Sequence, residues 1–228
     1  MYRNLTITLC LPCRNEGNHL SKVIKKVPKI VDEIIVVSNK STDNTVAVAK
    51  KLGVKVIEEN NTLNGIGYGY AHIAGIKAAT SDIIMGADGD GTYPFESLPE
   101  VIDKLIDENY DFISCNRYPT LDGTKIPFKL RLGVFLLNTE VYVLYGIRIK
   151  DILSGMWVFK RSVRKKLHLT AGDWNLSPQI KINAATAAGI KFGELSIAQH
   201  QRWGESHQKY FQTGISHAWW ILKHRFSN

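Results

Sequence analysis

Short apolar runs alternate with helix-like stretches through the first half of the chain. Runs rich in β-branched and other apolar residues predict strands at residues 5–11, 33–37, 54–57, 82–85 and 111–115. The spacing of apolar positions between them predicts helices at residues 18–27, 43–51, 70–79 and 95–107. Ser41 or Thr42 is the expected N-cap of the second helix. Strands separated by helices of about ten residues predict an α/β fold with a mainly parallel sheet and helices on both faces.

The pattern changes after Tyr118. Residues 125–149 combine basic side chains with an apolar stretch at 130–144, which fits loosely amphipathic helices. Such a segment either packs in the core or lies in a membrane interface between its basic flanks. The remaining pattern predicts a helix at 179–188, a strand at 192–198 and an aromatic-rich helix at 210–226. No repeat, low-complexity tract or linker divides the chain, so we expect a single domain over residues 1–228.

The composition is that of a globular protein with a basic surface. The 228 residues can bury one large core, and 44% hydrophobic with 22% charged residues excludes wholesale disorder. A net charge of +8 indicates an anionic partner, either a phosphorylated substrate, a membrane surface or nucleic acid. Because no dense lysine and arginine block with interleaved aromatics occurs, we do not expect nucleic acid as the partner.

The cysteines and the hydropathy of the chain indicate in which cellular compartment the protein is expected. Cys10, Cys13 and Cys115 are an odd number without disulfide-framework spacing, which suits a reducing cytoplasm. No signal peptide is expected, because the sequence starts directly with a predicted strand. No apolar run reaches the roughly 18–20 residues needed to cross a bilayer. We therefore expect a cytoplasmic protein that is soluble or peripheral to a membrane.

Asp88 and Asp90 follow the predicted strand at residues 82–85 in the sequence G-A-D-G-D-G. Two carboxylates this close repel each other, so a fold tolerates them best around a positive charge. Their hard oxygen atoms suit Mg²⁺ or Mn²⁺, which commonly bind together with phosphates. The alternative is a polar turn, because Asp and Gly are ordinary turn formers.

Polar clusters follow four of the predicted strands, at residues 12–16, 38–41, 88–90 and 116–118. In parallel sheets flanked by helices, ligands bind beyond the carboxyl ends of the strands. We therefore expect the four clusters to meet in one crevice, which favours the metal site over the turn.

Four segments in this order resemble the inverting glycosyltransferases of family 2, and most closely the dolichyl-phosphate mannose and glucose synthases with their polyprenyl-phosphate relatives. They are P-C-R-N-E at residues 12–16, the strand and loop I-I-V-V-S-N-K-S-T-D-N-T at 34–45, the stretch 65–94 with its D-G-D, and R-W-G-E-S at 202–206. The resemblance implies the GT-A fold, with a Rossmann-like, mainly parallel sheet flanked by helices. Residues 1–118 would form the nucleotide-sugar-binding half and residues 119–228 the acceptor-binding half, with helices at a membrane interface.

The resemblance also assigns catalysis to the crevice. Asp88 and Asp90 would hold Mg²⁺ or Mn²⁺, with Gly89 between them close to the phosphates. The metal would stabilise the departing nucleoside diphosphate as a Lewis acid. Arg202 would close over the donor phosphates, and together with Asp90 and Asp151 it makes up the expected catalytic set.

Other positions would bind the rest of the donor and the acceptor. Arg117 and Arg131 are expected at the donor diphosphate or at an acceptor phosphate. Ser38 and Asn39 stand where many relatives carry acidic residues, which leaves the donor open between a UDP- and a GDP-hexose. The residues expected at the nucleoside are Pro12, Arg14, Glu16, Val37 and Asn39.

The acceptor determines whether a general base is needed. A polyprenyl phosphate is already anionic at neutral pH, whereas a sugar hydroxyl needs a carboxylate to take its proton. Asp151 is expected to be that base or to position the acceptor. We expect transfer of a hexose to a polyprenyl phosphate such as dolichyl phosphate, with residues 125–150 on the cytoplasmic face of the membrane. The alternatives are a glycan or cell-surface polysaccharide acceptor, and a catalytically silent protein that binds nucleotide sugars.

Overall fold

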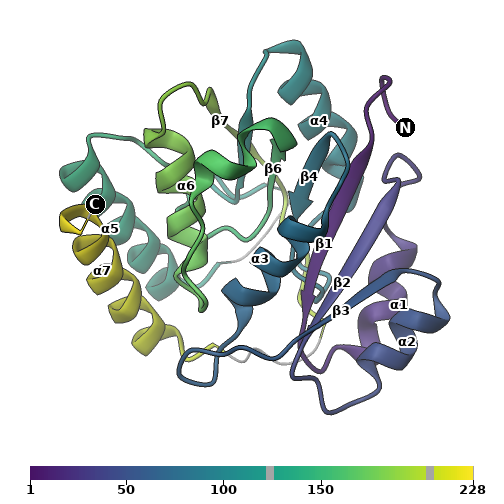
Figure 1. Cartoon of the computed structure of the whole chain (residues 1–228). Helices are drawn as coiled ribbons and strands as arrows, with labels where there is room; N and C mark the ends of the chain where they lie inside the picture. Colours follow the sequence, from purple (N-terminus) through teal and green to yellow (C-terminus); the bar gives the residue numbers. More distant parts are fainter. Residues whose placement is uncertain (122–125, 204–207, 228) are drawn as a thin grey trace.

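A seven-stranded sheet forms the centre of the computed structural model, which describes residues 1–121, 126–203 and 208–227 (Figure 1). Its order within this part of the chain is β3-β2-β1-β4-β6-β5-β7. All neighbouring pairs are parallel except those that β6 makes with β4 and β5. The strands are β1 (Ile7–Cys13), β2 (Glu33–Asn39), β3 (Lys55–Glu59), β4 (Ile83–Gly86), β5 (Phe112–Asn116), β6 (Trp157–Lys160) and β7 (Phe192–Ser196).

Helices cover both faces of this sheet, as the pattern predicted. On one face α1, α2 and α4 pack into an apolar cluster that includes Leu20, Ala49 and Val101. On the other face α3 and α6 bury Ile76 and Ile180. The helices are α1 (Gly17–Lys25), α2 (Thr45–Lys51), α3 (Tyr68–Ala78), α4 (Leu98–Asp107), α5 (Phe128–Tyr145), α6 (Leu176–Thr186) and α7 (Tyr210–Phe226), with 3-10 turns at Phe95–Ser97 and Arg161–Leu167.

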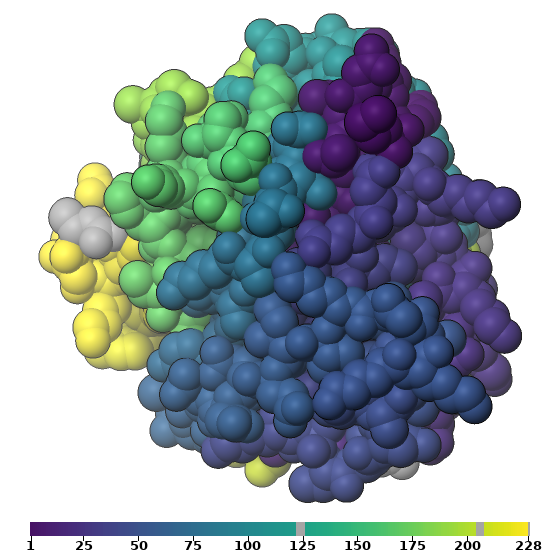
Figure 2. All heavy atoms as spheres, turned by 45° about the vertical axis from the view of Figure 1, so that its right-hand side comes forward, coloured from purple at the N-terminus to yellow at the C-terminus, as the bar shows by residue number. Residues whose placement is uncertain are grey.

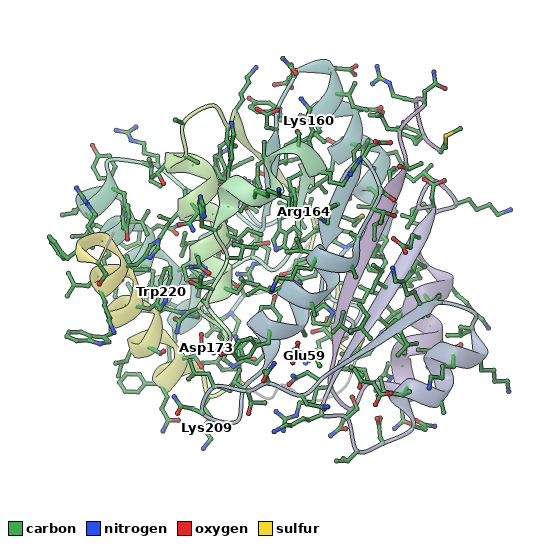
Figure 3. All side chains as sticks on the ribbon, in the orientation of Figure 1. Glu59, Lys160, Arg164, Asp173, Lys209 and Trp220 are labelled. Carbon is green, nitrogen blue, oxygen red and sulfur yellow. The ribbon has the colours of Figure 1, made fainter. Side chains whose placement is uncertain are left out.

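Strand β6 was not predicted from the sequence. It is four residues long and fully apolar over its first three positions, so it has no alternation that would mark a strand. It lies between β4 and β5, where Trp157 pairs with Gly86. Figure 3 shows the reversed direction: Lys160, at the end of β6, lies at the opposite side of the sheet from Glu59, at the end of β3.

The expected cap of α2 was also wrong. Neither Ser41 nor Thr42 caps the helix; instead Asp43 Oδ1 accepts a hydrogen bond from the Thr45 amide at 3.0 Å. The Ser41 hydroxyl accepts a hydrogen bond from the Asn15 amide, and the Thr42 amide donates to Asn15 Oδ1. These two residues therefore join the β2–α2 loop to the β1–α1 loop, which fixes one wall of the crevice.

Helices α5 and α7 lie side by side at one edge of the molecule (Figure 1), and Figure 2 shows the yellow atoms of α7 at that edge. A third apolar cluster joins them to α6 through Val141, Ile221 and Ile182. The expected helix pattern at residues 125–149 is thus a single helix, and Lys125 lies outside the described residues. In the part of the chain that the structure describes, no helix is long and apolar enough to cross a membrane.

Candidate active site

A cavity of about 1080 Å³ opens along the carboxyl ends of the parallel strands. Its walls come from the loops after β1, β2, β4 and β5, so the polar clusters expected to converge do meet there. The 38–41 cluster contributes through Asn39. The residues lining the cavity include Arg14, Asn39, Asp88, Arg117 and Leu130.

The turn at residues 88–91 depends on two glycines. A side chain at Gly89 would place Cβ 2.6 Å from Cys13 Sγ, so glycine lets this turn pack directly against the end of β1. Gly91 has φ +79°, a conformation that L side chains rarely adopt, and a Cβ there would meet the Trp203 ring at 2.7 Å. The two glycines hold Asp88 and Asp90 against β1 and beneath Trp203.

Asp88 lies in a position that favours a bound cation. Its Oδ1 accepts a hydrogen bond from the Tyr68 hydroxyl at 3.0 Å. Burial, and then the negative charge of Asp90, raise the pKa of Asp88 to about 7. A divalent ion between the two carboxylates would remove this repulsion. Two carboxylate ligands would leave the remaining positions to phosphate and water, which suits Mg²⁺ or Mn²⁺. Among the described residues no group of three or more His, Cys, Asp or Glu forms a complete metal site.

Asp90 is paired with Arg202. Arg202 Nη1 lies 2.9 Å from Asp90 Oδ2, and Nη2 lies 3.8 Å from Glu16 Oε1. The other oxygen of Asp90 accepts hydrogen bonds from the amide and hydroxyl of Thr92. Burial and the charge of Asp90 raise the pKa of Glu16 to about 7. Arg202 thus partly neutralises the carboxylates; residues 204–207 of the same segment lie outside the described residues.

Most of the residues expected at the nucleoside line the cavity. Pro12, Arg14, Glu16 and Asn39 line the cavity, and Glu16 makes no side-chain cap to α1. Val37 does not line the cavity: it is fully buried in the apolar cluster beneath α3, on the same face of the sheet as Asn39 but two residues further from the strand end.

The amide of Asn39 has a fixed orientation. Its Nδ2 donates to the carbonyl oxygens of Glu59 at 2.8 Å and Asn61 at 3.0 Å. Reversing the amide would face its oxygen toward two other acceptors. Its Oδ1 is buried and has no hydrogen-bond partner among the described residues, so the site presents one unpaired acceptor.

Asp151 lies behind Arg117, not in the cavity lining. Arg117 Nε donates to Oδ2 of the fully buried Asp151 at 2.6 Å, and Nη2 donates to Oδ1 at 3.0 Å. Burial alone would raise the pKa of Asp151, but the charge and hydrogen bonds of Arg117 hold it below the ordinary 3.8. A carboxylate paired in this way is a poor proton acceptor, so the geometry favours positioning of Arg117 over the expected role as a base.

The remaining expectation at the phosphates concerns Arg131. Its side chain is exposed on α5 and is not among the cavity-lining residues, because the helix turns it away from neighbouring Leu130. Arg117 and Arg202 both line the cavity, and the positive charges of both act on Asp88. The described cavity therefore offers two of the three expected arginines.

Sequence reasoning missed several residues of the site. Tyr68, Trp174 and His217 line the cavity, and the fully buried Lys181 donates to the carbonyls of Ile152, Ser154 and Ser177. Tyr68 lies in the glycine-rich G-I-G-Y-G-Y, which signals a close approach of backbone. The other three lie in helical or loop sequence with no motif, so their positions follow from tertiary packing alone.

Comparison with known proteins agrees with this geometry. Residues 8–167 match the family model of Glycosyl transferase family 2. The dolichyl-phosphate hexose transferase of Haloferax volcanii is 29% identical over 205 residues, covering 89% of this chain and 86% of that protein. The low-salt glycan biosynthesis hexosyltransferase Agl6 of the same organism is 29% identical over 224 residues, which is 95% of this chain. The chain spans about half of Agl6 (53%).

A solved structure has the same fold. Glucosyl-3-phosphoglycerate synthase from Mycobacterium tuberculosis, crystallised with Mn²⁺, UDP and phosphoglyceric acid, superposes with a TM-score of 0.75 at 19% identity, covering 97% of this chain and 78% of that chain. With the GT-A fold and the family match both established, the chain is a glycosyltransferase and belongs to glycosyl transferase family 2.

Proposed function

We propose that this enzyme transfers a hexose from a UDP-sugar to a polyprenyl phosphate at a membrane surface. The observation that carries the proposal is an arginine in a cavity that α5 lines with apolar side chains. Arg117 lines the cavity together with Leu130 and Val134 of α5, so a phosphate with an apolar chain matches this lining better than a polar glycan does. Two relatives are named for dolichyl phosphate, the hexose transferase of Haloferax volcanii and a UDP-N-acetylglucosamine transferase of Methanococcus voltae, 27% identical over 181 residues.

The preference for UDP over GDP rests on Asn39. Its unpaired Oδ1 can accept one hydrogen bond, and uracil presents a single N–H between two carbonyl groups. Guanine presents two neighbouring donor groups and so needs a second acceptor. A buried acceptor without its donor costs about 1–3 kcal/mol, which the uracil N–H would remove.

The reaction needs charge stabilisation more than proton transfer. A metal held by Asp88 and Asp90 would supply Lewis acidity at the donor diphosphate. Arg202 can add a second positive charge there, and Arg117, held by Asp151, would orient the acceptor phosphate. A phosphate oxygen attacks the anomeric carbon, the bond from that carbon to UDP breaks, and UDP leaves with the electron pair. No proton has to be removed from the anionic acceptor.

Membrane contact is supported by the outer sides of α5 and α7. Phe128 is 75% exposed and Phe211 is 82% exposed, although both belong to helices packed on the domain. Many exposed apolar side chains on two neighbouring helices are typical of an interaction site. Lys129 and Arg131 flank it, which suits the anionic cytoplasmic leaflet. The apolar surface comprises Phe128, Leu132, Phe135, Leu136, Tyr142, Val143, Tyr210, Phe211, Ile215, Trp219, Leu222 and Phe226.

Liposome flotation combined with a transfer assay tests the proposal. Vesicles with anionic lipid and polyprenyl phosphate should carry the wild-type protein upward and, with Mn²⁺ and a radiolabelled UDP-hexose, yield labelled lipid. Charge reversal at Lys129 and Arg131 should abolish flotation. The matched control reverses Lys22 and Lys25 on α1, which Figure 1 shows at the far side of the molecule from α5, and should leave flotation intact.

Three other results would overturn parts of the proposal. Transfer to soluble glycans without any vesicle binding would establish a glycan acceptor. Metal-dependent binding of UDP-sugars without transfer or hydrolysis would establish a silent binding protein. Tighter binding of GDP than of UDP would refute the role given to Asn39.

A further inference from the structure

His217 is a buried histidine that α7 places in the wall of the active-site cavity. It is 2% exposed and lines the cavity together with Trp174 and Ser177 of the α6 region. The family match ends at residue 167, so α7 lies beyond the part of the chain that it covers. The role of His217 therefore has to be inferred from its own contacts.

Two neighbours fix the His217 ring. Its Nδ1 lies 2.9 Å from Asn175 Oδ1. The Asn175 amide cannot be reversed, because its Nδ2 already donates to Asp173 Oδ2 at 2.9 Å and to Ser216 Oγ at 3.2 Å. His217 Nδ1 must therefore carry the proton and donate. Figure 3 shows Asp173 at the same end of the sheet as Glu59, the end at which the cavity opens.

The second ring nitrogen is then a hydrogen-bond acceptor. Nε2 has no protein partner among the described residues. Burial, followed by the positive charge of Lys181, lowers the pKa of His217 to about 4, so the ring is neutral at physiological pH. A bare nitrogen repels the oxygens of a phosphate and attracts a hydroxyl group. The chemistry at this point of the cavity therefore fits a sugar better than it fits either phosphate.

The surroundings of His217 connect to the metal-binding turn. The half-buried Trp174 packs against Tyr68 with ring centroids 4.6 Å apart, and the Tyr68 hydroxyl donates to Asp88. Ser177 lines the same wall. Aromatic faces beside hydroxyl-binding groups suit a hexose ring, which has apolar C–H faces and a polar rim. A hexose joined to a diphosphate at Asp88 would extend along this wall.

We propose that His217, positioned by Asn175 and Asp173, is a specificity-determining residue whose Nε2 accepts a hydrogen bond from a hydroxyl of the transferred hexose, beside the Trp174 ring. This inference rests on the proposed function, because it takes a UDP-hexose as the donor. It names the part of the cavity that distinguishes one hexose from another and assigns it to the C-terminal helix.

Calorimetric titration with Mn²⁺ tests the contact, with UDP and a UDP-hexose as separate ligands. His217→Phe keeps a planar ring and removes the acceptor, so the affinity for UDP-hexose should fall about 3–10-fold, the effect of one hydrogen bond, while UDP affinity stays within twofold. His217→Gln, whose amide oxygen can accept, should recover part of the loss. His224→Phe is the matched control on the same helix, because His224 bonds Asn183 and does not line this cavity.

Deoxyfluoro UDP-hexoses identify the hydroxyl, since fluorine cannot donate a hydrogen bond. Wild-type protein should lose affinity at one ring position, and His217→Phe should show no further loss at that position. Equal effects of His217→Phe on UDP and UDP-hexose, or a loss at the same ring position in both proteins, would overturn the contact. Absence of transfer to polyprenyl phosphate by a wild type that binds UDP-hexose would instead overturn the proposed acceptor and leave the contact in place.

Discussion

Asp151→Asn offers the sharpest test of how the site is built, because it changes one charge inside a buried ion pair. Asp151 accepts four hydrogen bonds, from Arg117 Nε, Nη2 and backbone N and from the Leu153 amide. In asparagine one oxygen becomes an NH₂ group, which must face donor groups whichever way the amide is turned. The substitution therefore removes the negative charge and places the new NH₂ group against N–H groups that also donate.

The expected loss of stability is large. Removing one partner from a buried ion pair costs about 3–5 kcal/mol, because the other charge stays buried without compensation. Asp151 is fully buried and the Arg117 side chain is 18% exposed, so solvent screens this pair little. For a chain of this length each 1 kcal/mol lowers Tm by about 2–4 °C, which predicts a drop of roughly 6–20 °C.

Urea unfolding followed by tryptophan fluorescence measures the effect, and a double-mutant cycle with Arg117→Met isolates the pair. The two changes together should cost at least about 2 kcal/mol less than the sum of the single changes, since the double variant no longer buries either member of the pair without the other. Strict additivity, or a loss below about 1 kcal/mol for Asp151→Asn, would refute the ion pair. Normal stability and UDP binding with abolished turnover would restore Asp151 as the general base.

The Asp151–Arg117 pair also makes the stability of the folded protein depend on pH in the acid range. Because the folded pKa of Asp151 is held below the ordinary 3.8, its contribution to stability is present above about pH 4 and is lost as the pH falls through the folded value. In Asp151→Asn the free energy of unfolding should therefore change less with pH in this acid range. An equally steep acid loss in the variant would show that other carboxylates cause it.

Three further substitutions test the metal site proposed at residues 88–91. Asp88→Ala should abolish the Mn²⁺-dependent part of UDP binding in calorimetry; an unchanged Mn²⁺ dependence would put the metal elsewhere. Arg202→Met should strengthen Mn²⁺ binding without nucleotide by roughly tenfold, about 1.4 kcal/mol, because the guanidinium no longer competes for Asp90. Electron paramagnetic resonance of free Mn²⁺ measures this, and weaker binding would contradict it. Gly91→Ala should lower the free energy of unfolding by about 1–2 kcal/mol, since φ is +79° there; unchanged urea unfolding would show that the turn relaxes.

The donor end of the site could be predicted from sequence because it is encoded locally. Apolar runs marked where strands end, and in a parallel sheet these ends share one edge. That rule alone brought Arg14, Asn39 and Asp88 together, as the cavity confirms. The prediction for Val37 was wrong because this residue, although on the same sheet face as Asn39, lies two residues further from the strand end, where α3 covers it.

The acceptor end could not be predicted because its residues meet only through long-range packing. Strand β6 is recognisable from its pairing with β4 and β5, not from its four residues. Asp151 lies in the loop between α5 and that strand, and its bond to Arg117 spans 34 positions of sequence. His217 bonds Asn175 across 42 positions, in sequence without any motif.

The position of β5 has a consequence for how the protein is made. Its neighbours in the sheet are β6 and β7, which are both synthesised later, and β4, made earlier, is separated from it by β6. During translation the apolar Phe112–Asn116 segment must wait for the 40 residues between Asn116 and Trp157 before any partner emerges. At about 5–20 residues per second this interval is roughly 2–8 s. The nascent chain therefore exposes an unpaired apolar strand throughout that time, and chaperone binding on the ribosome should concentrate there.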